Sequence, residues 1–413
     1  MPQSRKDNKG RMLRKGESFR NTDNRYVYKY VDPYGVPRSI YSIDLQKLRE
    51  KEKELAKDQL DGLDVYLAGS ATLNFVFDRY ITTKINLRKT TKSNYNYMYD
   101  KFVRDTFGKR LIAEIKYSDI MNFYLHLIND KNLQINTVDG IQTLLHPTFQ
   151  LAVRDEIIRK NPADGVIGEI SKLSGKNIGI RHALTIEQQR AFMKYVADQP
   201  ENNRYWPFFV VMFGTGCRIG EVIGLRWVDC DFENREISIN HSVVYYPEEG
   251  SATRKSVLSV SLPKTEAGVR TIPMMEEVYD ALQLEYEDQK EEGFNTTIID
   301  GMSGFIFKNR FGNVPNPQTV NRTIQRIRQD YNKRELLVSK REKREPLLIP
   351  TFSCHVTRHT FCTRLCETET NLKVIQEVMG HADIQTTMNV YAEATKAKKK
   401  EAIANLSKNA KLF

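Results

Sequence analysis

Residues 354–361 read Cys-His-Val-Thr-Arg-His-Thr-Phe, and residues 379–391 read Met-Gly-His-Ala-Asp-Ile-Gln-Thr-Thr-Met-Asn-Val-Tyr. In the first stretch, His355 and Arg358 are three residues apart, so both side chains project from one face of a helix. In the second, a glycine predicts the end of a helix and His381 follows it directly. Tyr391 comes ten residues after His381 and belongs to the next predicted helix. The two stretches therefore predict successive helices that carry two histidines, an arginine and a tyrosine.

A third segment places another arginine in a setting that suits an anion. Residues 214–221 read Gly-Thr-Gly-Cys-Arg-Ile-Gly-Glu, so Arg218 follows a tight glycine turn and opens a helix predicted over 219–225. Backbone N–H groups at a helix start are free to bind a negative group. Each residue also has a structural alternative, because arginines at helix starts are common and Tyr391 is one of 20 tyrosines. Their order and spacing favour a functional role.

A metal site is a weaker interpretation of the same region. His355 and His359 are four residues apart and share a helix face, with Cys354 and Cys362 on either side. A zinc metalloprotease would need glutamate where Val356 stands, and the two thiols do not follow a familiar ligand spacing. The sequence also has no phosphate-binding loop of the nucleotide hydrolases. We therefore expect neither a metal nor a cofactor.

Two arginines, two histidines, a lysine and a tyrosine suit one target together, a phosphodiester. Bidentate arginines neutralise its non-bridging oxygens as negative charge builds in the transition state. A tyrosine hydroxyl is a usable nucleophile when a neighbouring base takes its proton, and a lysine can protonate the leaving alkoxide.

Composition supports a nucleic acid as the partner. The chain has 413 residues, with 63 Lys and Arg against 52 Asp and Glu, and a net charge of +11. This balance favours a polyanion. Five cysteines without a CxxC pair indicate a reducing compartment, and the longest apolar run, 206–213, is too short to span a membrane. We expect a cytoplasmic protein with no membrane partner.

The pattern along the chain predicts three domains. Residues 1–65 form a small module of sheet and helix, with strands at 25–31 and 37–41, a helix from Asp44, and a solvated arm over the first fifteen residues. Residues 72–165 show four apolar stripes at helical spacing and predict an all-α domain whose last helix stops near residue 160. A Gly/Ser/Lys connector is expected over 166–180, after an earlier linker at 61–71.

The third domain, 181–413, is expected to be mixed α+β and mainly helical, with a C-terminal tail. Thr185 and Gln188 predict a capping box at its first helix. Residues 206–213 predict a buried apolar helix. A small antiparallel sheet is expected from three strands, 236–246, 256–262 and 269–272.

These motifs resemble those of the tyrosine recombinase family, the phage-type integrases. The resemblance rests on four segments in family order: the glycine turn with Arg218 and Glu221, Pro263-Lys264-Thr265 with Arg270, the helix of His355 and Arg358, and Met379-Gly380-His381 with Tyr391. The helical domain is similar to the family's core-binding domain. The N-terminal module resembles the arm-binding domain of integrases from conjugative transposons. Gly268, Thr357 and Met379 depart from common family residues, and none is at a catalytic position.

The resemblance implies a role for each residue of the site. Arg218 and Arg358 would clamp the scissile phosphate, and Lys264, on a hairpin turn, would be the general acid. His355 would assist as general base, His381 would bond the phosphate, and Tyr391 would form a 3′-phosphotyrosyl link. Glu221 would be a structural partner of the site.

The implied function is site-specific DNA recombination that integrates and excises a mobile element without ATP. The implied partners are double-stranded DNA at core and arm-type sites, three further copies of the chain in a homotetramer, and a helper excision or DNA-bending protein. Two alternatives remain: a type IB topoisomerase, and a catalytically inactive DNA-binding regulator of the same fold.

Overall fold

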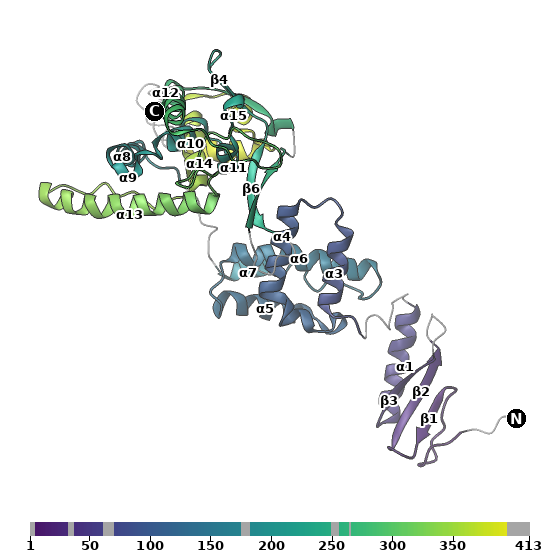
Figure 1. The fold of residues 1–413 in the computed structure, drawn as a ribbon. Coiled ribbons are helices and arrows are strands. Elements are labelled where there is room, and N and C mark those ends of the chain that lie inside the picture. The colour runs from purple at the N-terminus through teal and green to yellow at the C-terminus, as the bar shows by residue number, and fades with distance from the viewer. Residues whose placement is uncertain are drawn as a thin grey trace, which may run out of the picture. The chain divides into compact units, whose positions relative to one another are not determined.

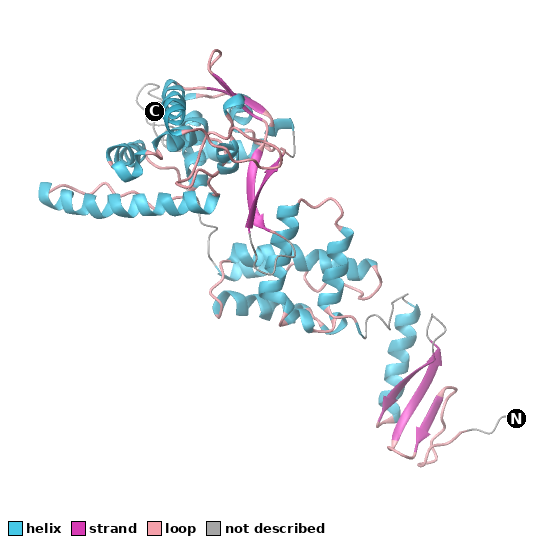
Figure 2. Ribbon diagram, in the orientation of Figure 1, coloured by secondary structure: helices cyan, strands magenta, loops and turns pink. Residues whose placement is uncertain are grey.

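The computed structural model describes six segments of the chain, residues 5–31, 37–60, 70–174, 182–248, 256–263 and 266–394. The chain divides into two units, residues 1–178 and 179–413 (Figure 1). Both units are built mainly from helices, and the strands form small antiparallel sheets (Figure 2). None of the helices in the described part of the chain has the length and hydropathy that a membrane span requires.

The N-terminal module is a three-stranded antiparallel sheet packed against one helix (Figure 1). Its elements are β1 (Glu17–Arg20), β2 (Arg25–Val31), β3 (Pro37–Ser42) and α1 (Leu45–Leu60). Tyr26 of β2 meets Leu45 and Leu48 of α1 in a small core. The two predicted strands and the helix are confirmed, whereas β1 was not predicted.

Most of the residues described before β1 are exposed, as expected for a solvated arm, but one acidic side chain holds the segment against the sheet. Asp7 is buried, and its carboxylate accepts hydrogen bonds from the backbone N–H groups of Lys9 and Arg11. The hydroxyl of Tyr26 also donates to Asp7 at 2.8 Å. A single acid in a basic segment therefore gathers enough donors to hold that segment on the sheet.

The second part of this unit is an all-α domain around one core. Its helices are α3 (Leu73–Thr83), α4 (Lys89–Tyr99), η1 (Asp100–Arg104), η2 (Phe107–Lys109), η3 (Ile112–Glu114), α5 (Tyr117–Asn129), α6 (Ile135–Arg154) and α7 (Val166–Ser174). The four predicted stripes fall on α3, on α4 with η1, on α5 and on α6.

The boundary expected near residue 160 needs correction. Helix α6 ends at Arg154, and residues from 166 to 174, expected as a connector, form α7. Val166 and Ile170 are four residues apart and are both buried in the core of the helical domain. This apolar pair explains why a segment rich in glycine and serine still forms a helix. Residues 61–69 of the linker expected at 61–71, and residues 175–180 of the connector expected at 166–180, lie outside the described residues.

The second unit is built around the apolar helix α10 (Trp206–Thr215), which is buried along most of its length. Three helices pack against it, α8 (Ile186–Asp198), α12 (Glu276–Glu292) and α14 (Cys354–Thr368). The other helices described in this unit are α9 (Pro200–Asn203), α11 (Ile219–Gly224), η4 (Trp227–Asp229), η5 (Glu266–Gly268), α13 (Pro317–Glu342), α15 (Leu372–Met379) and α16 (Ile384–Ala394). The capping box of Thr185 and Gln188 is present at the start of α8, as predicted.

The expected single sheet is two small antiparallel sheets. The first has the order β4-β5-β8 and the second is the β6-β7 hairpin. Their strands are β4 (Cys230–Asp231), β5 (Glu236–Ile239), β6 (Ser242–Pro247), β7 (Ser256–Ser261) and β8 (Arg270–Pro273). The predicted strand 236–246 breaks at His241, whose buried Nε2 bonds the carbonyl of Gly224 at 2.7 Å. That bond holds the chain where it passes from one sheet to the other.

Candidate active site

The glycine turn before Arg218 brings the end of α10 close to α14. Gly216 is left-handed, with φ of 62°, and a Cβ there would lie 2.3 Å from the ring of Phe361. The residue must therefore be glycine for both backbone and packing reasons. Arg218 then caps α11, and its backbone N–H donates to Glu221 at 2.9 Å. The predicted start of this helix is confirmed.

Arg358 lies on α14 and is only 4% exposed. Its two terminal nitrogens donate to backbone carbonyls, one to Gly216 at 2.8 Å and the other to Met379 at 2.5 Å. Burial, and then the neighbouring charge of Arg218, lower the pKa of Arg358 to about 10. The side chain therefore stays charged near neutral pH, and neutral groups hold it in place.

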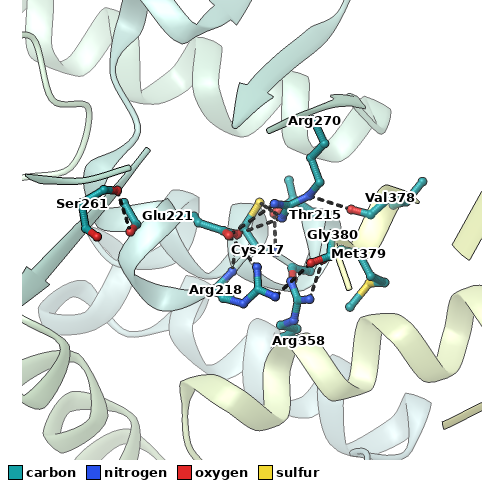
Figure 3. Close-up of polar contacts among 12 residues, drawn as sticks. Thr215, Cys217, Arg218, Glu221, Ser261, Arg270, Arg358, Val378, Met379 and Gly380 are labelled. Atoms are coloured by element: carbon teal, nitrogen blue, oxygen red, sulfur yellow. Dashed lines mark hydrogen bonds and ion pairs between the residues drawn. The ribbon is translucent and has the colours of Figure 1, made fainter. Parts of the chain in front are cut away.

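The C-terminal end of α15 is the point on which three arginines converge (Figure 3). The carbonyl of Val378 accepts from Arg270 at 2.9 Å, that of Met379 from Arg358 at 2.5 Å, and that of Gly380 from Arg218 at 3.0 Å. Carbonyls at a helix C-terminus lack partners inside the helix and carry partial negative charge. Guanidinium groups satisfy them here, and the carbonyls fix where the guanidinium groups lie.

Glu221 joins two of these arginines. Its carboxylate accepts from Arg218 at 2.8 Å and from Arg270 at 2.8 and 3.3 Å. Burial alone raises the pKa of Glu221, but the hydrogen bond and charge of Arg270, followed by Arg218, outweigh it and lower the pKa to about 2. Glu221 is thus an ionised structural partner, as the sequence predicted.

Arg270 is a residue of the site that sequence reasoning left without a role. It is 9% exposed, lies on β8, and connects Glu221 to the last turn of α15. The sequence did hold a signal for this role: an arginine in a short strand, between Val269 and Ile272, at a position that faces the core. A charged residue is rarely buried without a partner.

A cavity of about 330 Å³ lies beside the arginines. Arg218, His355, Arg358 and His381 line it, together with Asp383, whose carboxylate accepts from the backbone N–H of Gln385. The structure therefore brings four of the six predicted site residues to one place. His355 is exposed and His381 is buried. Burial, then the charges of Arg358 and Arg218, lower the pKa of His381 to about 4, so its imidazole is neutral near pH 7.

Of the remaining two predicted residues, the structure describes only Tyr391, which does not line the cavity. Tyr391 lies on α16, half-buried in a small cluster of α14, α15 and α16 that includes Cys362 and Met379. It is not among the residues that line the cavity, whereas its neighbour Val390 is. Lys264 lies outside the described residues.

The hairpin expected around Lys264 is corrected by its flanking strands. Strand β7 pairs with β6, and β8 pairs with β5. The segment between β7 and β8 therefore connects two different sheets and does not close a hairpin. Within the described residues it contains the short helix η5.

The arrangement is suited to an anion with several oxygens. The hydrogen bonds given above use two of the five N–H donors of each cavity arginine, so further donors of Arg218 and Arg358 remain for a ligand. Planar guanidinium groups match phosphate geometry. Among the described residues, no group of three or more His, Cys, Asp or Glu side chains is placed to hold a metal ion.

Comparison with known families agrees with this geometry. Residues 182–398 match the Phage integrase family, which covers the unit that contains the cavity. Residues 1–59 match the DNA binding domain of Tn916 integrase.

Relatives match nearly the whole chain. The transposase from transposon Tn916 of Enterococcus faecalis is 32% identical over 409 residues, covering 96% of this chain and 95% of that protein. The transposase from transposon Tn1545 of Streptococcus pneumoniae gives the same identity and coverage. The solved structure of the Tn1549 transposon integrase in complex with transposon right end DNA is 31% identical, with a TM-score of 0.68, and covers 82% of this chain and 99% of that one.

Proposed function

This chain belongs to the phage integrase family, and we propose which of its residues perform the family's reaction. It is a tyrosine-type site-specific DNA recombinase that integrates and excises a mobile element. The single observation that carries the assignment of residues is the convergence of Arg218 and Arg358 on the end of α15, beside a cavity that His355 and His381 also line.

Arg218 and Arg358 bind the two non-bridging oxygens of the scissile phosphate. Neutral carbonyls hold both terminal nitrogens of Arg358, so its charge is not neutralised before DNA arrives. Negative charge develops on these oxygens as the phosphorus becomes five-coordinate, and preorganised donors stabilise it without rearranging. His381, neutral and buried, bonds the same phosphate.

Tyr391 is the nucleophile. Its hydroxyl oxygen forms a bond to phosphorus while the bond to the 5′ oxygen of the next nucleotide breaks. His355 takes the tyrosine proton, and Lys264 gives a proton to the departing 5′ oxygen. The product is a 3′-phosphotyrosyl bond. It retains the energy of the broken phosphodiester, so a second 5′ hydroxyl can reverse the attack without ATP.

Double-stranded DNA is the substrate, and we assign its recognition to separate domains. The helical domain, which begins at residue 72 and includes α7, and the catalytic domain 181–413 bind core sites, and the module 1–65 binds arm-type sites. The match of residues 1–59 to a DNA-binding domain and the net charge of +11 support this division. Recombining two duplexes requires four cleavages, and therefore four copies of Tyr391 in a homotetramer, with a helper excision or bending protein. Five free cysteines support a cytoplasmic location.

A suicide substrate tests the proposal. The full chain is mixed with a duplex that joins the two ends of its own mobile element, nicked so that the released 5′ end diffuses away. We expect a covalent adduct that survives denaturant with the natural chain and with the control Tyr286→Phe, but not with Tyr391→Phe. DNA binding should be the same for all three. An adduct formed by Tyr391→Phe would identify another nucleophile, and supercoil relaxation without joining of defined sites would favour a topoisomerase.

A further inference from the structure

The ring of His381 has a partner that the proposed chemistry has not used. Its Nδ1 lies 3.0 Å from the hydroxyl oxygen of Thr387, and both side chains are buried. Thr387 has no exposed surface, so in this arrangement water does not compete for its hydroxyl. The bond joins the loop after α15 to α16, the helix that carries Tyr391.

The backbone of His381 is held independently of this bond. Its N–H donates to the carbonyl of Gln376 at 3.1 Å, and the side-chain amide of Gln376 donates back to the carbonyl of His381 at 3.0 Å. Two bonds to one residue therefore fix the position of the main chain. The rotation of the imidazole and the choice of its protonated nitrogen are left to Thr387.

That choice decides whether His381 helps or hinders an anion. A neutral imidazole has one N–H donor and one acceptor nitrogen. If Nδ1 donated to Thr387, Nε2 would meet a phosphate oxygen with a lone pair and repel it. If the hydroxyl of Thr387 donates to Nδ1, the proton is on Nε2, the ring nitrogen left for the ligand. Only the second arrangement stabilises a phosphate.

We propose that Thr387 is a positioning residue for the recombination reaction, whose hydroxyl donates to Nδ1 of His381 and so holds the proton on Nε2 for the scissile phosphate. The proposal rests on the proposed function of this site. Thr387 is also four residues before Tyr391, so both side chains lie on the same side of α16. The contact between Thr387 and His381 therefore does two things at once: it places α16, the helix of the nucleophile, and it orients the phosphate-binding histidine.

The first test compares two substitutions of Thr387 in the full chain. Thr387→Val keeps the shape of the side chain and removes the hydroxyl, and Thr387→Ser keeps the hydroxyl. We expect Thr387→Val to slow cleavage at saturating DNA by about 10- to 100-fold, an effect typical of losing a bond that orients a histidine, with unchanged DNA affinity. Thr387→Ser should recover most of the rate. Thr148→Val, which also removes a fully buried hydroxyl, is the matched control in the helical domain.

The second test asks whether Thr387 acts through His381. In a His381→Ala background, Thr387→Val should cause no further loss of rate, because the group that it orients is absent. An equal loss in both backgrounds, or a Thr387→Val enzyme as fast as the natural one, would overturn the proposal.

A third measurement does not depend on activity. Nitrogen-15 NMR of histidine-labelled protein, with the His381 signal assigned through His381→Ala, should show Nε2 protonated in the natural chain and a mixture of tautomers in Thr387→Val. A proton on Nδ1 in the natural chain would refute the proposal even if cleavage were never observed. Absence of any Tyr391-dependent adduct together with the expected tautomer would instead refute the proposed function of the site.

Discussion

Replacing Glu221 by glutamine tests how the arginines of the site are held. The carboxylate is 7% exposed and accepts from Arg218 and Arg270. Glutamine has nearly the same shape but no charge. Its amide nitrogen is a hydrogen-bond donor and would face the guanidinium groups of Arg218 and Arg270, which are donors as well. Glu221→Gln therefore leaves the charge of buried Arg270 uncompensated, which is the costly way to break a buried ion pair.

The magnitude follows from the pKa of Glu221. Burial raises that pKa, but the hydrogen bond and charge of Arg270, with those of Arg218, bring it from 4.5 to about 2. A fall of this size corresponds to about 3 kcal/mol of stability at neutral pH. Because the pKa is lower in the folded protein, this stability is fully present above pH 4.5 and is lost as the pH falls towards 2. We expect Glu221→Gln to be less stable by about 3 kcal/mol at pH 7, with the gap narrowing below pH 4.5.

Urea unfolding of the full chain measures this directly. Both tryptophans, Trp206 and Trp227, lie in the catalytic unit, so their fluorescence reports that unit alone. The control is Glu287→Gln, which breaks a pair with Lys290 in which both side chains are 61% exposed, and it should change stability by less than about 0.5 kcal/mol. A loss for Glu221→Gln as small as the control's, or one that stays constant from pH 7 to well below 4.5, would refute the reasoning.

Four further predictions follow from the same site and its domains. Lys264→Ala should slow cleavage of ordinary DNA by at least about 100-fold. The cleavage rate should largely recover when sulfur replaces the leaving 5′ oxygen, because a sulfur leaving group needs no acid. Equal defects on both substrates would make Lys264 a positioning residue. Gly380→Ala should lower the free energy of unfolding by about 1–2 kcal/mol because the backbone there is left-handed, and by more because the added Cβ would lie 2.9 Å from Arg270. Urea unfolding should therefore find it less stable than the control Gly312→Ala, where φ is 77° and the space around the residue is open. Removing residues 1–65 should leave core-site cleavage intact and abolish high-affinity binding to a distal DNA sequence in gel-shift assays; unchanged affinity for every segment would give the module another role. A strong chelator should leave the cleavage rate unchanged, and a loss restored by magnesium would contradict this.

Much of the fold was predictable where local pattern and burial agree. The run Trp206–Phe213 predicts a buried helix, and α10 extends over it to Thr215. Thr185 and Gln188 predict the first turn of α8, because the hydrogen bonds of this capping box join residues that are close in the sequence. The break at His241 was not predictable from local pattern, because the bond that holds this residue joins it to Gly224, seventeen residues earlier in the chain.

The same distinction holds for the site. His355 and Arg358 stand at helical spacing, Arg218 follows a glycine turn and His381 follows a helix-ending glycine, so the sequence could propose that they act together. Arg270 could not be given its role in this way, since its partners Glu221 and Val378 are 49 and 108 residues away. A charge pair over such distances leaves no periodic signal, and only the folded chain reveals it.

What holds the arginines also explains why the site can bind an anion strongly. A carboxylate beside a guanidinium cancels the charge that a phosphate would use, whereas a carbonyl orients the group and leaves most of that charge in place. Among the described residues, the hydrogen bonds of Arg358, the more buried of the two cavity arginines, go to carbonyls, and the carboxylate of Glu221 lies between Arg218 and Arg270. Two of the anchoring carbonyls belong to Met379 and Gly380, directly before His381, so the end of α15 positions the arginines and the histidine together. The sequence predicts this helix end from Gly380, but backbone carbonyls are the same in every sequence, so only the folded chain shows that they orient the arginines.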